Sequence, residues 1–297
     1  MRILLTGANG LLGQKLVELI LTTDDYLIAT AKSKLVLPLP KGEFHPMDIT
    51  NRQQVMDVIA LTHPDVVINT AAMTNVDQCE LEKEKCWLSN VTAVEFLVAA
   101  CKVTNSKLIH VSTDFIFDGT HGPLDEEAVP NPISYYGESK WAAEQIVQKS
   151  GLAWAIARTV LVYGVTKDMS RSNIVLWVKK SLEEGKTINV VNDQWRTPTL
   201  AEDLAMGCYL IATKQATGVF NISGEEMMTP YDIAIATASF FGLDKSLIHQ
   251  TDSTKFKQAA KRPPKTGFVI DKAKRLLDYH PARFRDGVIK LKEKLQS

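Results

Sequence analysis

Short apolar runs alternate with longer segments of helical periodicity along the first half of the chain. The runs expected to form strands cover residues 2–6, 26–30, 65–69, 107–112 and 154–159. The segments between them that repeat apolar residues with helical spacing cover residues 11–22, 53–61, 80–103 and 134–150. Nearly continuous apolar runs such as 66–68 suit strands that are buried on both faces of a parallel sheet. The alternation therefore predicts an α/β fold built on a doubly wound parallel sheet.

The second half of the chain is less regular. Helices are expected over 174–184, 200–213, 272–278 and 285–295, and strands over 187–191 and 218–222. Thr229 and Pro230 suit the N-cap and the first position of another helix. The segment 261–265 contains two prolines and is expected to be an extended loop. We expect this half to contribute a smaller lobe and not an independent module.

Three glycines follow the first predicted strand with the spacing G-x-x-G-x-x-G. They are Gly7, Gly10 and Gly13, and the third lies inside the first predicted helix. Glycine lets the backbone turn tightly and approach a pyrophosphate, while the free N–H groups of the helix N-terminus attract the phosphates. A strand before and a helix after the glycines favour a dinucleotide site over a purely structural turn. Residues 1–165 would then form a dinucleotide-binding Rossmann domain to which residues 188–215 return, and residues 166–297 mostly a smaller C-terminal substrate-binding lobe.

The residues after the second predicted strand indicate which dinucleotide binds. NAD sites usually carry an Asp or Glu there, which holds the ribose 2′-hydroxyl. This chain has Lys32, Ser33 and Lys34 instead. Two ammonium groups and a hydroxyl can bind a 2′-phosphate. The pattern favours NADPH, with NAD as the alternative if the lysines are only solvated loop residues.

Tyr136 and Lys140 are four residues apart in a predicted helix, so their side chains share one helix face. An ammonium beside a phenol lowers the pKa of the phenol, and we expect Tyr136 to exchange a proton with a carbonyl or hydroxyl group of a substrate. Tyr163 and Lys167 have the same spacing. Because Gly164 and β-branched residues lie between them, we expect a loop in which this second pair does not share a face.

Hydroxyl side chains end the fourth predicted strand. Ser112 and Thr113 lie at the carboxyl edge of the sheet, where open α/β sheets bind their ligands. A hydroxyl at this edge can donate a hydrogen bond to a carbonyl oxygen that gains negative charge during a reaction. The alternative is that both hydroxyls only satisfy the backbone at the strand end.

Composition excludes several other classes of protein. Lys plus Arg and Asp plus Glu are both 34, and the resulting net charge of zero does not favour a general nucleic-acid binder. The four cysteines form no C-x-x-C pair and are expected to be buried free thiols. The six histidines form no H-x-x-x-H pair, so no metal site is expected. Neither a signal peptide nor an uninterrupted apolar run of membrane-spanning length is visible, and we expect a cytoplasmic protein that does not bind membranes.

Together these motifs resemble those of the extended short-chain dehydrogenase/reductases. Within that family they are most similar to the dTDP-4-dehydrorhamnose reductase group of sugar-nucleotide-binding reductases. The similarity runs along nearly the whole chain. The segments that carry it are 4–13, 64–72, 74–77, 112–117, 136–140, 192–194, 197–199 and 261–263.

The resemblance implies a role for each matching residue. Thr113, Tyr136 and Lys140 would be the catalytic residues, and the last two would also touch the cofactor. The other residues that would contact the cofactor are Gly7, Gly10, Leu11, Leu12 and Gly13 at the pyrophosphate, Asp48 and Ile49 at the adenine, and Ala71, Ala72 and Met73 along its length. The residues that would face the substrate are Asp114, Phe115, Arg196 and Arg262. The two arginines suit a nucleotide diphosphate, with a surface salt bridge as the alternative for Arg196.

Three positions depart from the pattern of the group. Phe115 stands where such reductases usually have Tyr, and Leu161 stands where many have Trp. Lys15 stands where some have a Glu that binds a metal at a dimer interface. The first two departures bear on the choice of sugar. The third argues against a metal-linked dimer and leaves a monomer or another homodimer.

The resemblance implies NADPH-dependent reduction of a 4-keto deoxysugar nucleotide, most closely dTDP-4-dehydrorhamnose to dTDP-L-rhamnose or a close analogue. Two alternatives stay open. The same scaffold hosts sugar-nucleotide epimerases and dehydratases, which retain their cofactor through the reaction. Related non-enzymatic subunits, such as that of methionine adenosyltransferase, bind NADP and a partner protein.

Overall fold

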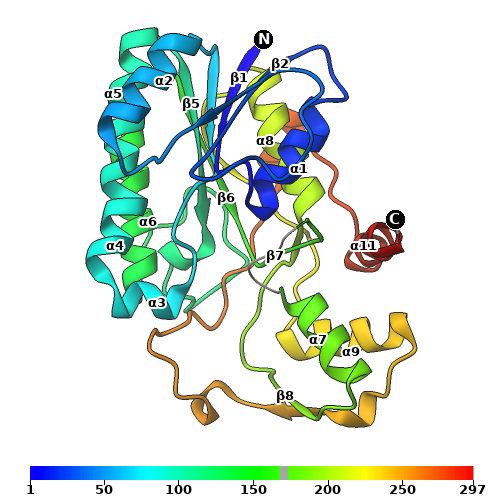
Figure 1. Ribbon diagram of the computed structural model, residues 1–297. Coiled ribbons are helices and arrows are strands. Elements are labelled where there is room, and N and C mark those ends of the chain that lie inside the picture. The colour runs from blue at the N-terminus through cyan, green and yellow to red at the C-terminus, as the bar shows by residue number, and fades with distance from the viewer. Residues whose placement is uncertain (168–172, 297) are drawn as a thin grey trace.

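The computed structural model describes residues 1–167 and 173–296 of the chain. Its centre is a seven-stranded sheet with the order β10-β6-β5-β4-β1-β2-β3 (Figure 1). The strands are β1 (Arg2–Thr6), β2 (Tyr26–Ala31), β3 (Glu43–Pro46), β4 (Val66–Asn69), β5 (Lys107–Thr113), β6 (Trp154–Thr159) and β10 (Gly218–Asn221). Every neighbouring pair is parallel. The predicted α/β fold with a doubly wound parallel sheet is confirmed.

One strand of the central sheet was missed by the sequence analysis. The segment Glu43–Pro46 forms β3, an edge strand that pairs with β2. It is four residues long, none of them fully buried, and it ends on a proline. Pro is tolerated on edge strands because its missing N–H can face solvent. Such a short, half-polar segment carries too weak an apolar pattern to be recognised.

Two layers of helices cover the sheet (Figure 1). One layer contains α1 (Leu11–Ile20), α8 (Ala201–Thr213) and α10 (Asp271–Leu277), and the other contains α2 (Arg52–Thr62), α5 (Ala93–Thr104) and α6 (Tyr135–Gln148). A separate cluster of buried apolar side chains lies under each layer. Burial on both faces explains why the strands read as nearly continuous apolar runs.

The predicted helix over residues 80–103 is interrupted. The chain forms α3 (Val76–Leu81), α4 (Lys83–Trp87), a π-helical turn (Leu88–Thr92) and then α5. Glu82 leaves the helical conformation, with φ −122° and ψ 57°, and separates α3 from α4. By length and composition the stretch Lys83–Thr104 could cross a membrane, but half of its most apolar window is buried. Because α5 packs between α2 and α6, it is a core helix of this fold.

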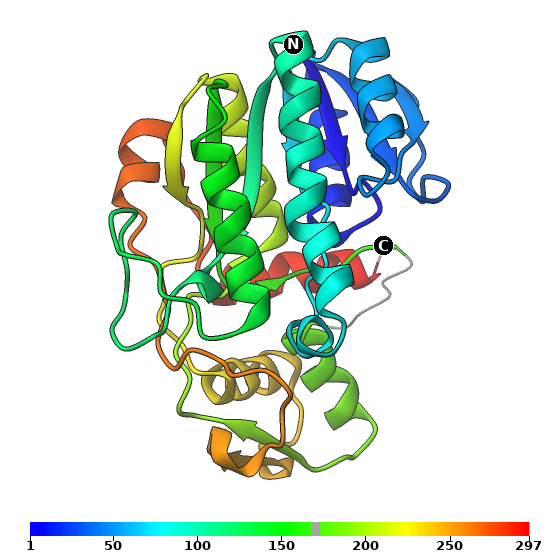
Figure 2. The ribbon, with the colours of Figure 1, turned by 90° about the vertical axis from the view of Figure 1, so that its left-hand side faces the viewer.

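A smaller lobe lies beyond the carboxyl ends of the strands (Figures 1 and 2). Its core forms between α7 (Ile174–Glu183), α9 (Pro230–Phe241) and the parallel pair β8 (Ile188–Val191) and β11 (Ile248–Thr251). The predicted start of α9 is confirmed, because Thr229 and Asp232 form a reciprocal capping box with Pro230 at the first turn. The remaining elements are the pair β7 (Val162–Tyr163) and β9 (Thr199–Leu200), helix α11 (Phe284–Gln296), and 3₁₀ turns at Asp114–Ile116, Lys245–Leu247 and Ser253–Lys255.

Candidate active site

The glycine loop joins β1 to α1 at the carboxyl edge of the sheet. Gly7 has φ +69°, a conformation that side chains disfavour. A Cβ atom on Gly13 would lie 2.1 Å from the Gly7 carbonyl oxygen, so only glycine allows this turn to pack against the helix. The free N–H groups at the start of α1 therefore border open space above β1 and β4, where the strand order reverses.

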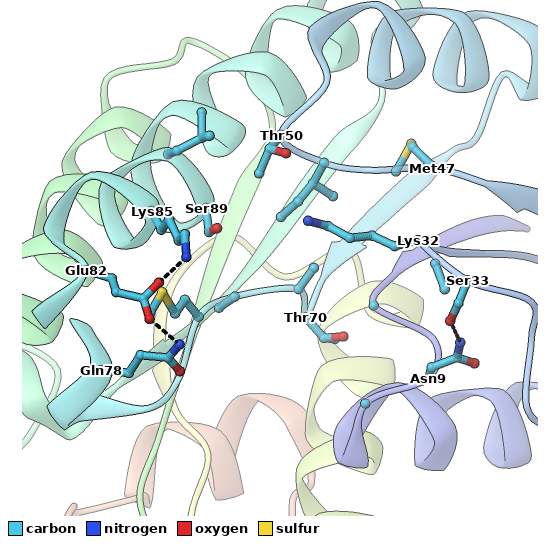
Figure 3. A pocket seen from close by; sticks show the side chains of 18 residues that line it. Asn9, Lys32, Ser33, Met47, Thr50, Thr70, Gln78, Glu82, Lys85 and Ser89 are labelled. Atoms are coloured by element: carbon cyan, nitrogen blue, oxygen red, sulfur yellow. Dashed lines mark hydrogen bonds and ion pairs between the residues drawn. The ribbon is translucent and has the colours of Figure 1, made fainter. Parts of the chain in front are cut away.

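A cavity of about 600 Å³ opens beside this loop (Figure 3). Eight of the predicted cofactor residues line it, namely Gly7, Gly10, Lys32, Ser33, Ile49, Ala71, Ala72 and Met73. The other six do not line it. Leu11, Leu12 and Gly13 lie in the first turn of α1, Asp48 forms an ion pair with Lys32 at 3.1 Å, and Tyr136 and Lys140 lie on α6. The structure thus gathers residues from the loops after β1, β2, β3 and β4, and from α3, α4 and the π-helical turn, around one cavity.

Asn9 was missed by the sequence analysis. Its side-chain amide donates to the Ser33 hydroxyl at 3.2 Å and to the Lys34 carbonyl at 3.0 Å, and its oxygen accepts from the Val36 N–H at 3.0 Å. Figure 3 shows the contact between Asn9 and Ser33 at one end of the cavity. Asn9 therefore ties the glycine loop to the segment that carries Lys32.

Tyr136 lies buried in the first turn of α6, which Ser134 caps, and its side chain reaches the Thr113 hydroxyl at the end of β5. Burial raises the pKa of Tyr136 far above its usual value, and the hydrogen bond from Thr113 only partly opposes this. The sequence-based expectation of a lowered pKa is wrong for this structure, because burial outweighs the other influences. The phenol keeps its proton at neutral pH and can act as a proton donor.

Lys140 lies one turn further along α6 and is also buried. Its ammonium nitrogen Nζ contacts His110 Nε2 at 3.0 Å and donates to the Val111 carbonyl at 2.7 Å. Burial lowers the pKa of Lys140 to about 8. Lys140 is thus directed toward β5, and its influence is absent from the principal causes of the Tyr136 pKa shift.

Asn90, in the π-helical turn, is a second residue that the sequence analysis missed. Its amide exchanges hydrogen bonds with the Met73 backbone, receiving from the N–H at 2.8 Å and donating to the carbonyl at 3.0 Å. It also donates to the Ser139 hydroxyl on α6 at 3.0 Å. A single buried Asn inside an apolar helical stretch is the signal that could have revealed it. Asn90 fixes the cavity wall at Met73 to the helix that carries Tyr136.

Asp114 and Arg196 form a buried ion pair between the two halves of the protein. Arg196 Nε lies 3.4 Å from Asp114 Oδ2, and both side chains are at most 5% exposed. Thr266 also donates to the Asp114 carboxylate. Burial raises the pKa of Asp114, and the Arg196 charge opposes the shift. The alternative of a surface salt bridge for Arg196 is therefore wrong, because the pair is enclosed.

The two predicted diphosphate residues lie close together. Arg196 donates to the Pro263 carbonyl at 2.7 Å, and burial together with the Arg262 charge lowers the pKa of Arg196. Arg262 forms two hydrogen bonds to Asp77 in α3, at 2.6 and 3.1 Å. The loop that carries Arg262 is therefore attached to α3, which also contributes to the cavity wall. Both guanidinium groups already have partners within the chain.

Phe115 packs directly on the candidate proton donor. Its ring meets the Tyr136 ring edge-on at 5.6 Å, and the Arg196 guanidinium lies 5.9 Å from its centre. Leu161, with φ +39°, is half-buried and packs between the sheet core and the cluster around Tyr163. Phe115 thus borders the reacting groups, whereas Leu161 packs against two apolar clusters and stays partly exposed.

The second Tyr–Lys pair does not form a site. Tyr163 is buried in β7, where its ring packs on Phe284 at 5.2 Å, and Lys167 is exposed. This agrees with the expectation that their side chains do not share a face.

Lys15 is buried too, and its ammonium lies 3.1 Å from Glu18 and 3.4 Å from Glu202. This chain therefore has a buried lysine ammonium group at the position where some similar reductases have a metal-binding Glu.

The cysteines are free and buried, as the sequence predicted. Cys79 and Cys86 pack against the Tyr136 ring from α3 and α4. Among residues 1–167 and 173–296, no group of three His, Cys, Asp or Glu side chains is placed to hold a metal ion.

Comparison with known proteins gives matches along nearly the whole chain. The family model described as RmlD substrate binding domain matches residues 1–297. The chain is 32% identical to a dTDP-4-keto-6-deoxy-D-glucose reductase of Streptomyces niveus, over 88% of this chain and 86% of that protein. It is 30% identical to methionine adenosyltransferase 2 subunit beta of Xenopus laevis, over 82% of this chain and 73% of that protein. A crystal structure of a Bacillus anthracis dTDP-4-dehydrorhamnose reductase in complex with NADP superimposes with a TM-score of 0.85 at 27% identity, covering 99% of both chains.

Proposed function

Because this chain belongs to the RmlD substrate binding domain family, we propose that it is an NADPH-dependent reductase of a 4-keto deoxysugar nucleotide. The observation that carries the proposal is the hydrogen bond between Thr113 and Tyr136, next to Met73, which lines the cavity that the glycine loop borders. The relatives named as reductases of dTDP-linked keto sugars support the reaction class. We infer dTDP-4-dehydrorhamnose or a close analogue as the substrate.

The cavity fits a nicotinamide dinucleotide. Its size, the turn that only glycine permits, and the free N–H groups of α1 suit the pyrophosphate, while Lys32 and Ser33 suit a 2′-phosphate. Met73 would lie near the nicotinamide end, because Asn90 fixes it to the helix of Tyr136. Bound NADPH supplies a hydride for the keto carbon.

The protein's own residues would manage the proton and the charge. Tyr136, which burial keeps protonated, donates its proton to the oxygen of the keto group as that oxygen becomes an alkoxide. The Thr113 hydroxyl donates a hydrogen bond to the same oxygen and stabilises the developing charge. Lys140 would hold the nicotinamide ribose, and its positive charge would stabilise the Tyr136 phenolate that remains after proton transfer.

The substrate's diphosphate would bind near Arg196 and Arg262. The two guanidinium groups lie close enough for the Arg262 charge to act on Arg196. A guanidinium group can donate hydrogen bonds to two phosphate oxygens at once. Asp114 would accept hydrogen bonds from the hydroxyl groups of the sugar, and its ion pair holds the Arg196 side chain in place. Phe115 would cover the sugar beside Tyr136.

A panel of nucleotide-linked 4-keto sugars, assayed with NADPH and with NADH, tests the proposal. We expect NADPH oxidation with a dTDP-linked 4-keto deoxysugar and none with the corresponding dTDP-linked sugar that carries a hydroxyl group in place of the 4-keto group. Purified protein that retains NAD and interconverts sugar nucleotides without added cofactor would instead identify an epimerase or dehydratase.

A regulatory role is the second candidate. It is favoured by the likeness to methionine adenosyltransferase 2 subunit beta. NADP binding without turnover of any keto sugar, together with stoichiometric co-purification of a methionine adenosyltransferase, would support this role and contradict the reductase.

The loop after β2 leads to a prediction about cofactor choice. We expect NADPH to bind more tightly than NADH, and replacement of both Lys32 and Lys34 by Ala to narrow the difference, more strongly at low salt than at high salt. Dissociation constants measured by NADPH and NADH fluorescence check this. Lys102→Ala removes one positive charge from the last turn of α5 and should leave the ratio of the NADH and NADPH dissociation constants unchanged. Tighter binding of NADH by the unmodified protein would contradict the prediction.

Phe115 and Leu161, the two positions that differ from the pattern of the similar reductases and bear on the choice of sugar, lead to another prediction. Phe115→Tyr combined with Leu161→Trp is expected to raise kcat/KM for dTDP-4-dehydrorhamnose, because a hydrogen bond to a neutral partner contributes roughly 0.5–1.5 kcal/mol and the indole adds a flat surface for the sugar. Each single variant, measured with the same sugar, separates the two contributions. If the unmodified protein already reduces this sugar efficiently and the double variant does no better, these positions do not determine the sugar preference.

A further inference from the structure

His110 is fully buried in the middle of the sheet, yet none of the roles above uses it. It lies on β5 with its Nε2 atom 3.0 Å from Lys140 Nζ. Its other ring nitrogen, Nδ1, lies 3.0 Å from the side-chain amide nitrogen of Asn69 on β4. A buried polar side chain is costly unless it is hydrogen-bonded, and both nitrogens of this ring have partners.

The hydrogen-bonded chain continues to the glycine loop. Asn69 Oδ1 accepts from the Thr6 hydroxyl at 2.6 Å, and Thr6 is the last residue of β1 before Gly7. The sheet register pairs Thr6 with Asn69 and Asn69 with His110, so these three side chains stand next to one another on adjacent strands. The Ala71 N–H, in the cavity wall, donates to the same Thr6 hydroxyl at 3.3 Å.

The donors and acceptors of this chain can be assigned in two consistent ways. If Thr6 donates to Asn69 and Asn69 donates to Nδ1, the neutral ring carries its hydrogen on Nε2 and Lys140 accepts it as an amine. If the Asn69 amide is reversed, Nδ1 donates to Asn69, and Nε2 accepts from the Lys140 ammonium. His110 can therefore hold Lys140 Nζ in either charge state without itself becoming charged.

The electrostatic surroundings agree with a neutral ring. Burial, with the Lys140 charge as a smaller influence, holds the pKa of His110 well below its usual value. The other titratable groups that act on Lys140 are Glu144, which is paired with Arg158, and Cys86.

We propose that His110 is a positioning residue, which holds the Lys140 side chain in place and, through Asn69 and Thr6, fastens it to the strand end beneath the glycine loop. The inference rests on the proposed reductase function, in which Lys140 binds the nicotinamide ribose. A lysine side chain has four rotatable bonds, and its long stem needs such a partner to keep one orientation. This series of hydrogen bonds also fixes the position of Lys140 relative to the glycine loop, which would hold the pyrophosphate of the same cofactor.

Two substitutions separate the two contacts of the ring. His110→Asn places an amide near the Nδ1 position, which keeps a partner for Asn69 but does not reach Lys140. His110→Gln extends the amide by one methylene toward the Nε2 position and offers Lys140 an acceptor. We expect kcat to fall about tenfold or more in His110→Asn and to recover most of that loss in His110→Gln, with little change in KM for the keto sugar.

Ser106→Ala provides a matched structural control. Ser106 immediately precedes β5, is equally buried, and donates to the Pro64 carbonyl at 2.6 Å. Its loss should lower stability while kcat stays within about twofold of the unmodified value. A fall in kcat for His110→Asn no larger than that for Ser106→Ala, or no recovery in His110→Gln, would overturn the proposal.

A spectroscopic measurement tests the contact without any substrate. In protein with ¹⁵N-labelled histidine, the Nε2 resonance of His110 is expected to shift in Lys140→Met, and to shift more than the Nδ1 resonance. If neither resonance moves, His110 does not hold Lys140 and the proposal is wrong. If the resonance moves as expected but no keto sugar is reduced by the unmodified protein, the proposed function has failed and the His110–Lys140 contact stands.

Discussion

Tyr136→Phe is expected to lower kcat for keto-sugar reduction by roughly a hundredfold or more while NADPH binding persists. The substitution removes only the hydroxyl, and the ring keeps its edge-on contact with Phe115 and its packing on Cys79 and Cys86. The loss follows because the forming alkoxide would lose its proton donor and keep only the hydrogen bond from Thr113. Steady-state kinetics with a substrate identified from the keto-sugar panel, and NADPH titration by fluorescence, measure the two effects separately.

Tyr163→Phe is the matched control for this prediction. Tyr163 is buried as well, but its hydroxyl makes only a long contact of 3.5 Å to the Phe284 carbonyl, in the core beneath β7. Its removal should leave kcat almost unchanged. Near-normal turnover by Tyr136→Phe together with a large loss in Tyr163→Phe would show that the wrong tyrosine has been assigned as proton donor.

Arg158→Met is expected to lower the free energy of unfolding by about 3–5 kcal/mol. Arg158 on β6 contacts Glu144 on α6 at 2.8 Å, and the two side chains are 3% and 0% exposed. Removal of the guanidinium leaves the Glu144 carboxylate buried and without its cation. The cost is therefore the burial of an unpaired charge, which exceeds the loss of one favourable contact.

Urea unfolding followed by circular dichroism measures this effect, and two further variants interpret it. The double variant Arg158→Met/Glu144→Met should recover most of the lost stability, because an apolar pair of similar volume can replace a buried ion pair at little cost. Lys179→Met breaks a partly exposed pair with Glu183 on α7 and should change stability by at most about 1 kcal/mol. A cost for Arg158→Met no larger than that for Lys179→Met would contradict the prediction.

The site residues that could be recognised from sequence are those whose role depends on local structure. Gly7 and Gly13 were recognisable because a tight turn between a strand and a helix excludes larger residues whatever the rest of the chain does. The spacing of Tyr136 and Lys140 was readable because four residues make about one helical turn. Asn9 could not be recognised, because its partners are groups of another segment that only the folded chain brings near. Asn90 offered only the signal of a polar residue in an apolar stretch, and its backbone partner at Met73 appears only in the folded chain.

Protonation states required the tertiary structure as well. The four-residue spacing alone suggested that Lys140 lowers the pKa of Tyr136, whereas enclosure of the phenol raises it. Burial depends on every element packed around the ring, including Phe115 and the cysteines of α3 and α4, and spacing along one helix carries no information about it.

The sequence by itself determined most of the alternation of strands and helices in the first half of the chain, the glycine turn and the helix face that carries Tyr136, because periodicity and steric exclusion act over a few residues. Only the tertiary structure decided which charges meet. The sequence left open whether Arg196 is exposed or buried, and only the packing of the folded chain around Asp114 shows that it is buried. Likewise, His110 faces Lys140 across 30 residues of sequence and Asn69 across 41, and only the strand register and the seating of α6 on the sheet bring these groups within hydrogen-bonding distance.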